Sequence, residues 1–211
     1  MGTAKRSQHD VAVVGARAGG GALAMLLARM GHDVVVLDRA LLPSDTLSTH
    51  SINRGGVVQL HRWGLLDEVL ASGAPAIRQI TFHTPDGSLT RKVKDRAGVD
   101  VVVAPRRHAL DTIVARAAAD AGASLRLGVT VTGLRRDAMG RVTGLSARGP
   151  DGEAVEVDAK VVIGADGLRS HVARSVGAPL VDSRPAHSAT YYAYYGGASW
   201  SGNEFFVAER A

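Results

Sequence analysis

The residues with the clearest chemical potential lie between Asp10 and Arg39, in the sequence DVAVVGARAGGGALAMLLARMGHDVVVLDR. Gly15 allows a tight turn out of an apolar strand, and Gly20 lets the following helix pack closely against the sheet. The N–H groups at the N-terminus of that helix then point at an anion such as a pyrophosphate. Asp38, about 20 residues further on, is placed to accept hydrogen bonds from ribose hydroxyls. The spacing therefore predicts a nucleoside diphosphate site, in which an acid disfavours the 2′-phosphate of NADP.

The elements that must position these residues form a βαβ unit. Val11–Val14 is the first apolar strand, an alanine- and leucine-rich helix follows the glycines, and Val34–Leu37 is the second apolar strand. This agreement of neighbouring elements favours nucleotide binding over a merely flexible turn. One position departs from G-x-G-x-x-G, because Arg17 occupies the place of the second glycine. Its side chain either points outward or pairs with the pyrophosphate itself.

The apolar patterning of the remaining chain predicts further strands and helices, and hence an α/β fold. Val57–Leu70 reads as an amphipathic helix, and Arg107–Ala121 has apolar residues at helical spacing. A short helix is expected after Asp166-Gly167, ending at Val176. Strands are expected at Ile77–His83, Ser88–Lys94, Val99–Ala104, Ser124–Leu127, Val129–Arg135, Val142–Arg148, Ala154–Val157, Val161–Ala165, Ala189–Gly196 and Glu204–Ala208.

The composition excludes several classes of protein. At 211 residues the chain can bury one Rossmann-type core with a smaller annex. It contains no cysteine, which excludes disulfides, thiolate metal sites and the dithiol of a flavoprotein disulfide reductase. The net charge of +5 is scattered and aromatic residues make up only 4%, so no nucleic-acid surface is expected. The polar N-terminus and the lack of a long apolar run predict a cytoplasmic protein without a membrane span.

Three motifs occur in an informative order: the βαβ unit, PRRHALD at 105–111, and VVIGADGLRS at 161–170. Together they resemble the FAD-dependent aromatic hydroxylases of the para-hydroxybenzoate hydroxylase fold and their geranylgeranyl-reductase-like relatives. The resemblance covers essentially the whole chain. It implies a Rossmann-like FAD-binding domain with β-hairpin insertions and the start of a β-sheet substrate domain. It also implies FAD as cofactor and NAD(P)H as transient reductant.

The resemblance implies a domain division and a set of cofactor contacts. Residues 1–75 and 99–180 would form the FAD-binding domain, and residues 76–98 and 181–211 part of the substrate-domain sheet. Asp38 takes the adenosine ribose role. The cofactor-binding residues implied are Gly15, Ala16, Arg17, Gly20, Asp38, Arg39, Arg107, Val131, Asp166 and Gly167. No catalytic side chain and no metal ligand is assigned, because the flavin carries the chemistry.

Several of these residues also have a simpler structural interpretation. Arg107 would be solvated in the first turn of its helix, and Arg39 would be an exposed ion-pair partner. Val131 would be a core strand residue, and Asp166-Gly167 a turn after a buried strand. The sequence leaves both interpretations open for each of them.

Histidine and tyrosine residues outside these motifs are weaker candidates. His50 lies in a polar loop, where a lone histidine is usually solvated. Four tyrosines, Tyr191, Tyr192, Tyr194 and Tyr195, alternate across an expected strand. One face of that strand could line a substrate cavity, but packing within a sheet is the favoured interpretation.

The sequence departs from the family pattern after the Asp-Gly motif. The second, ribityl-binding motif with Gly-Asp at its centre is not found, nor is the long helical region that follows it in the family. Strand edges between Tyr191 and Phe206 would be left unpaired. We therefore expect either a fragment of a flavin enzyme, or a second chain or missing C-terminal half that completes the flavin site.

The leading functional expectation is an NAD(P)H-dependent monooxygenase that acts on a small organic or aromatic substrate. The alternatives are a flavin-dependent prenyl reductase and a truncated, catalytically silent nucleotide-binding paralogue. A tryptophan-type halogenase is disfavoured because no Trp-x-Trp-x-Ile-Pro run is present. A short-chain dehydrogenase is disfavoured because no tyrosine has a lysine four residues on.

Overall fold

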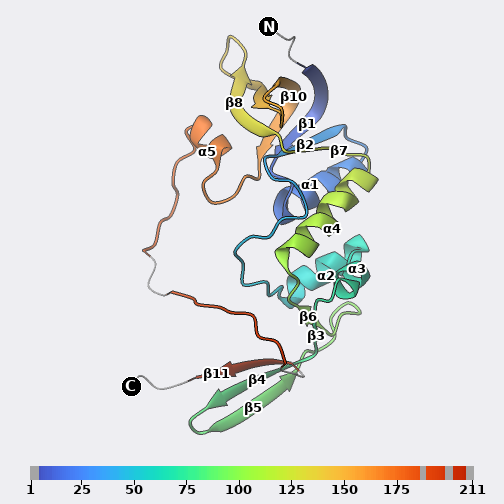
Figure 1. Cartoon of the computed structure of the whole chain (residues 1–211), viewed down its shortest axis with the longest axis vertical. Helices are drawn as coiled ribbons and strands as arrows, with labels where there is room; N and C mark the ends of the chain where they lie inside the picture. Colours follow the sequence, from blue (N-terminus) through green and yellow to red (C-terminus); the bar gives the residue numbers. More distant parts are fainter. Residues whose placement is uncertain (1–4, 186–188, 198–201, 208–211) are drawn as a thin grey trace. The chain divides into compact units, whose positions relative to one another are not determined.

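The computed structural model describes residues 5–185, 189–197 and 202–207 (Figure 1). The chain packs into two compact units. Unit 1 comprises Met1–Ser48 and Arg106–Ala178, and unit 2 comprises Thr49–Pro105 and Pro179–Ala211. The domain boundaries expected from the sequence remain a prediction. Within the described residues, no helix is both long and apolar enough to cross a bilayer.

Unit 1 is built on a six-stranded sheet with the order β7-β2-β1-β10-β9-β8. The first four strands in this order, β7, β2, β1 and β10, are parallel to one another. β9 pairs antiparallel with β10, and β8 pairs antiparallel with β9. This mixed sheet, with a βαβ unit at its centre, confirms the predicted α/β class. The strands are β1 (Lys5–Val14), β2 (Val34–Asp38), β7 (Ser124–Leu127), β8 (Thr130–Arg136), β9 (Val142–Arg148) and β10 (Ala154–Gly164).

The helices in the described part of unit 1 are α1 (Ala18–Arg29), α4 (Arg107–Asp120) and α5 (His171–Ser175). α1 and α4 pack side by side (Figure 1). Their approach is close at Gly21, where a Cβ atom would lie 3.0 Å from Cγ1 of Val114. This packing brings the N-terminus of α1, which follows the glycine-rich turn, next to the first turns of α4.

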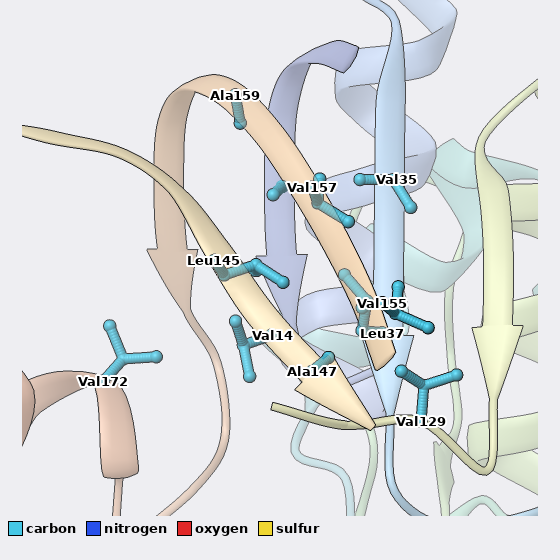
Figure 2. Close-up of a cluster of buried hydrophobic side chains, with 11 residues drawn as sticks. Val14, Val35, Leu37, Val129, Leu145, Ala147, Val155, Val157, Ala159 and Val172 are labelled. Carbon is cyan, nitrogen blue, oxygen red and sulfur yellow. The ribbon is translucent and has the colours of Figure 1, made fainter. Parts of the chain in front are cut away.

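The core of unit 1 includes a cluster of buried aliphatic side chains from β1, β2, β9 and β10, with Val129 just before β8 and one residue of α5 (Figure 2). Alternate residues of β10 contribute to it because successive side chains of a strand point to opposite faces. This cluster fixes the sheet on which the glycine-rich turn rests. Its members are Ala12, Val14, Val35, Leu37, Val129, Leu145, Ala147, Val155, Val157, Ala159 and Val172.

The described residues of unit 2 form two short helices and two small sheets. The order β11-β4-β5 makes a three-stranded sheet, and β3 pairs with β6. α2 ends at Gly64, which adopts a left-handed φ of 77°. The elements are α2 (Arg54–Trp63), α3 (Leu66–Ala71), β3 (Ala76–Ile77), β4 (Gln79–Thr84), β5 (Gly87–Lys92), β6 (Val102–Val103) and β11 (Asn203–Phe206).

Strand β10 corrects the expectation of two separate strands at Ala154–Val157 and Val161–Ala165. It runs unbroken because it pairs in parallel with β1 along almost its whole length. Polar residues between the two expected segments are held by ion pairs with other parts of unit 1. Asp158 binds Arg6 and Arg135, and Lys160 binds Asp10. For the same reason β1 begins at Lys5, well before the expected Val11.

Unit 2 contains the other corrections. The single helix expected at Val57–Leu70 is divided at Gly64 into α2 and α3. The strand expected at Ile77–His83 is divided into β3 and β4, and the one at Val99–Ala104 is reduced to the two residues of β6. The segment Ala189–Gly196 forms no strand, because its tyrosines have no neighbouring strand to pair with in the described part of the chain. β11 confirms the last expected strand from Glu204 to Phe206. Val207 lies just beyond its end, and Ala208 lies outside the described residues.

Candidate functional site

Asp38 ties the end of β2 to the glycine-rich turn. Its Oδ2 accepts a hydrogen bond from the backbone N–H of Ala16 at 2.8 Å, and its Oδ1 accepts one from the N–H of Ala40 at 2.8 Å. Each carboxylate oxygen has a second lone pair, so the group can accept further hydrogen bonds while it holds the turn. The backbone of Asp38 also accepts from the N–H of Val129, which places the start of β8 beside this carboxylate.

The glycine-rich turn rests directly on the end of β10. The N–H of Gly15 donates to the carbonyl of Leu37, and the N–H of Ala165 donates to the carbonyl of Val14. A Cβ atom at Gly15 would lie 2.5 Å from the carbonyl oxygen of Ala165, and one at Gly20 would lie 1.8 Å from the carbonyl oxygen of Gly15. Only glycine fits at both positions. The turn and the Gly-Ala-Asp-Gly motif, far apart in sequence, are therefore neighbours.

The N-terminus of α1 fits a pyrophosphate. The first backbone N–H groups of a helix have no intrahelical acceptor, and here Gly19 and Gly20 carry two of them. A Cβ atom at Gly19 would meet no atom within 4 Å, so this position faces open space. The helix dipole adds partial positive charge at the same place. Gly19, exposed beside open space in the first turn of the helix, offers the setting that an anionic group requires.

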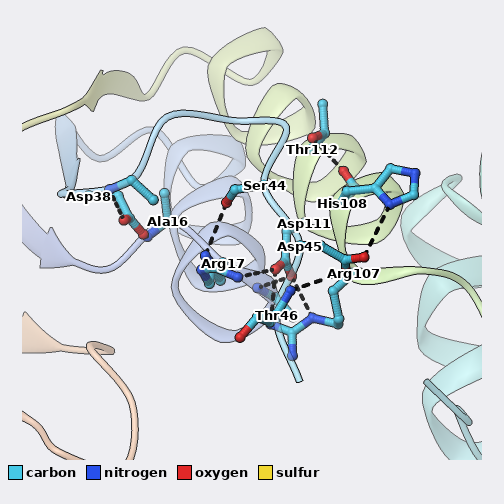
Figure 3. A network of polar contacts seen from close by, with 12 residues as sticks. Ala16, Arg17, Asp38, Ser44, Asp45, Thr46, Arg107, His108, Asp111 and Thr112 are labelled. Atoms are coloured by element: carbon cyan, nitrogen blue, oxygen red, sulfur yellow. Dashed lines mark hydrogen bonds and ion pairs between the residues drawn. The ribbon is translucent and has the colours of Figure 1, made fainter. Parts of the chain in front are cut away.

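Arg17 points inward at a carboxylate that sequence reasoning did not assign. Asp111 on α4 is fully buried and accepts hydrogen bonds from Nη1 of Arg17 at 3.3 Å and the N–H of Ala18 at 3.1 Å. It also accepts from Nε and Nη2 of Arg107, at 3.1 and 2.9 Å (Figure 3). Nη2 of Arg17 reaches the hydroxyl of Ser44 at 3.0 Å. Arg17 and Arg107 are thus brought together by Asp111.

The loop that follows β2 is fastened to the start of α4. Asp45 pairs with Arg106 and lies 3.8 Å from Nδ1 of His108 (Figure 3). The hydrogen bond from Arg106 is the largest cause of a lowered pKa of Asp45, so this carboxylate stays ionised. Together with Ser44 it places the loop beside the Arg17 and Asp111 pair. Three guanidinium groups, those of Arg17, Arg106 and Arg107, are thus held by the two carboxylates of Asp45 and Asp111 in this part of the site.

Asp166 is held at the start of α5. Its carboxylate accepts hydrogen bonds from the hydroxyl of Ser170 and the N–H of His171, both at 2.5 Å, and from the N–H of Val172 at 3.2 Å. Burial by itself would raise the pKa of Asp166, but the hydrogen bonds from Ser170 and from the backbone of Val172 and His171 outweigh it and lower the pKa. Asp166 therefore stabilises the start of α5 as an anion.

We expect Asp166→Ala to destabilise unit 1 by about 1–2 kcal/mol at neutral pH, because backbone N–H groups at a helix start lose their acceptor. Since the folded-state pKa lies below the unfolded value near 3.8, this contribution is complete above that value and is lost as the pH falls through the folded-state pKa. Urea unfolding of wild type and variant between pH 7 and pH 3 measures it. A difference that does not shrink in acid would contradict this role of the carboxylate.

Two of the expected site residues occupy more peripheral positions. The side chain of Arg39 is exposed next to Asp38. Val131 is partly buried and packs against the aliphatic core cluster, in agreement with the structural interpretation of this residue. The cofactor roles of both residues remain predictions. Sequence reasoning missed Asp111, although its position four residues after Arg107 on one helix was a usable signal of an ion pair.

His50 lies in unit 2, where it makes a hydrogen bond to the hydroxyl of Tyr194. The ring of Tyr192 meets it edge-on, with centroids 6.3 Å apart. Tyr191 and Tyr195 are 93% and 86% exposed, so these tyrosines are not packed in a sheet as expected. Within the described residues, no group of three or more histidine and acidic side chains is arranged to hold a metal ion.

The fold and the site define a nucleotide-binding domain: a βαβ unit whose glycine-rich turn meets an acid at the end of β2. The family model described as FAD binding domain matches residues 8–194. The chain belongs to this FAD-binding domain family. The predicted family and cofactor class are thereby confirmed.

The relatives of this chain include a monooxygenase and a reductase. The chain is 33% identical over 177 residues to kynurenine 3-monooxygenase of Salinispora arenicola, covering 79% of this chain and 38% of that protein. It is 29% identical over 177 residues to digeranylgeranylglycerophospholipid reductase of Methanocella arvoryzae, covering 82% and 42%. The chain thus spans about two fifths of the length of these curated relatives.

Solved structures show the same fold. The structure of pqsL, a probable FAD-dependent monooxygenase from Pseudomonas aeruginosa, superposes with a TM-score of 0.68 at 22% identity. The match covers 85% of this chain and 48% of that one. A geranylgeranyl bacteriochlorophyll reductase-like protein from Thermoplasma acidophilum matches with the same TM-score of 0.68 at 24% identity, covering 82% of this chain and 42% of that one.

Proposed function

We propose that unit 1 binds the adenosine diphosphate half of FAD. The observation that carries this proposal is that one turn joins two binding features. Asp38 accepts a hydrogen bond from the amide of Ala16, and the N-terminus of α1 faces open space at Gly19. In this proposal Asp38 accepts hydrogen bonds from the ribose, and the amides of α1 face the pyrophosphate. The other residues proposed to contact or shape the site are Gly15, Arg17, Gly20, Arg39, Arg107, Val131, Asp166 and Gly167.

The activity that we propose is that of an FAD-dependent oxidoreductase, most similar to the monooxygenases. When bound, FAD would supply two-electron redox chemistry between NAD(P)H and a second substrate. For hydroxylation of a small organic or aromatic molecule RH, the balance is RH + O₂ + NAD(P)H + H⁺ → ROH + H₂O + NAD(P)⁺. The residues of this chain supply binding and orientation. We propose a cytoplasmic location, and that residues outside this chain complete the flavin-ring side of the site.

A reductase is the second candidate, and the relation to a digeranylgeranylglycerophospholipid reductase favours it. A reductase of prenyl chains would bind the adenosine diphosphate half of FAD in the same way but would not consume O₂. Oxygen consumption therefore separates the two activities. A catalytically silent paralogue would show neither.

The test is the spectrum of the purified chain. After incubation with FAD and removal of the unbound nucleotide, we expect about one equivalent of flavin to stay with the protein and to bleach on anaerobic addition of NADH or NADPH. Retained flavin that does not bleach would contradict an oxidoreductase activity of this chain alone. A protein that retains no flavin would contradict FAD binding itself.

A further inference from the structure

Asp111 is the point at which the polar contacts of the site converge. Two arginines and one backbone amide donate to its fully buried carboxylate. We propose that Asp111 is a positioning residue that holds Arg17 as a ligand for the pyrophosphate. A guanidinium group would then replace the close backbone approach that the second glycine usually provides. This inference rests on the proposed binding of FAD.

The backbone at Arg17 does not require glycine. Its φ of −73° and ψ of −172° are values that any residue adopts, so the arginine is accommodated without strain. What decides its role is the direction of the side chain. Nη1 and Nη2 each donate one hydrogen bond, to Asp111 and Ser44, and the side chain keeps 30% of its exposure. A guanidinium has five N–H groups, so donors remain for a phosphate oxygen.

Asp111 is not explained by the stability of the fold. Leu110, Ile113 and Val114 of α4 are buried as well, so Asp111 lies in a largely apolar stretch of the helix. Burial of a carboxylate carries a desolvation cost of several kcal/mol, and apolar replacements of buried ion pairs are often neutral or stabilising. The carboxylate is required by the groups that it binds, which are the guanidinium groups of Arg17 and Arg107 and the N–H of Ala18. Without this carboxylate, the positive charges of Arg17 and Arg107 would repel each other beside the glycine-rich turn.

The charge of Asp111 and its geometry predict opposite effects on ligand binding. As a charge, Asp111 repels a pyrophosphate, so the neutral Asp111→Asn variant would bind a diphosphate more tightly. As a positioning group, Asp111 keeps Arg17 in place, so the same variant would bind more weakly. Asparagine also accepts a hydrogen bond from an amide at a helix N-terminus, so the contact to Ala18 is retained. The sign of the change therefore separates the two roles.

The experiment measures the affinities of the full chain for FAD and ADP by calorimetry, and for adenosine by ligand-observed NMR, at fixed ionic strength. The variants are Arg17→Ala, Arg17→Lys, Asp111→Asn and the double variant Arg17→Ala/Asp111→Asn. Asp158→Asn is the matched control, because Asp158 also lies between two arginines, Arg6 and Arg135, outside the site. Thermal unfolding of each variant reports on its folding.

We expect Arg17→Ala and Asp111→Asn each to weaken ADP about tenfold, with adenosine and the control unchanged. The double variant should lose no more than either single one, because the two residues act as a unit, and Arg17→Lys should recover part of the loss. Tighter ADP binding by Asp111→Asn, or an equal loss for ADP and adenosine, would overturn the inference. If Asp111→Asn fails to fold, the Arg17→Ala variant still tests the inference, because an unchanged affinity of that variant for ADP would overturn it. Wild type that binds neither FAD nor ADP would instead overturn the proposed function.

Discussion

Gly20→Ala is expected to destabilise unit 1 by more than about 3 kcal/mol, enough to leave much of the protein unfolded or insoluble. The new Cβ would lie 1.8 Å from the carbonyl oxygen of Gly15 and 3.0 Å from the Cβ of Ala165. Gly15 cannot yield, because its N–H is bonded to Leu37 and its own Cα faces the carbonyl of Ala165. Urea unfolding followed by far-UV circular dichroism measures the loss.

Gly19→Ala is the control for this variant. The two glycines are consecutive residues of α1, and a Cβ at Gly19 would meet nothing within 4 Å. Alanine is favoured over glycine in a helix by up to about 1 kcal/mol, so this variant should be as stable as wild type or more so. Equal stabilities of the two variants would contradict the close approach of α1 to the turn.

Asp38→Ala is expected to weaken FAD binding about 100-fold. The variant loses the acceptor for the amides of Ala16 and Ala40, which releases the turn from the end of β2. It also loses the group proposed to accept hydrogen bonds from the ribose. Hydrogen bonds to a charged group each contribute about 1.5–3 kcal/mol, so loss of one such contact accounts for a change of this size. Fluorescence quenching of FAD on titration with protein measures it.

Asp33→Ala is the matched control, because Asp33 precedes β2 at the end away from the turn and pairs there with His9. We expect this variant to bind FAD as wild type does. A folded Asp38→Ala protein with unchanged FAD affinity would rule out the proposed role of Asp38. Asp38→Asn keeps one acceptor oxygen, so its affinity for FAD should lie between those of Asp38→Ala and wild type.

The sequence predicted the parts of the fold that local signals determine. β7 and β9 have the bounds expected, because glycines stand next to them and their apolar residues follow the period of a strand. The continuity of β10 could not be predicted, because Asp158 and Lys160 are stabilised by ion pairs with residues about 150 positions away. The missing strand at the tyrosines has the same cause, since a strand exists only where a partner pairs with it.

The candidate site divides in the same way. Gly15, Gly20 and Asp38 follow from their spacing alone, since one βαβ unit sets their geometry. Asp111 depends on the approach of α1 to α4, which joins residues 94 positions apart. No sequence pattern around Arg17 predicts its contact with Asp111. The inward direction of the Arg17 side chain is therefore a property of the fold, which the sequence left open.

The central claim is that this chain binds FAD through its adenosine diphosphate half, and competition between nucleotides tests it most directly. We expect ADP to displace FAD from the purified chain in a calorimetric titration, while FMN at the same concentrations does not, because FMN lacks the adenosine and the second phosphate. FMN that binds as tightly as FAD, with no competition by ADP, would contradict the account.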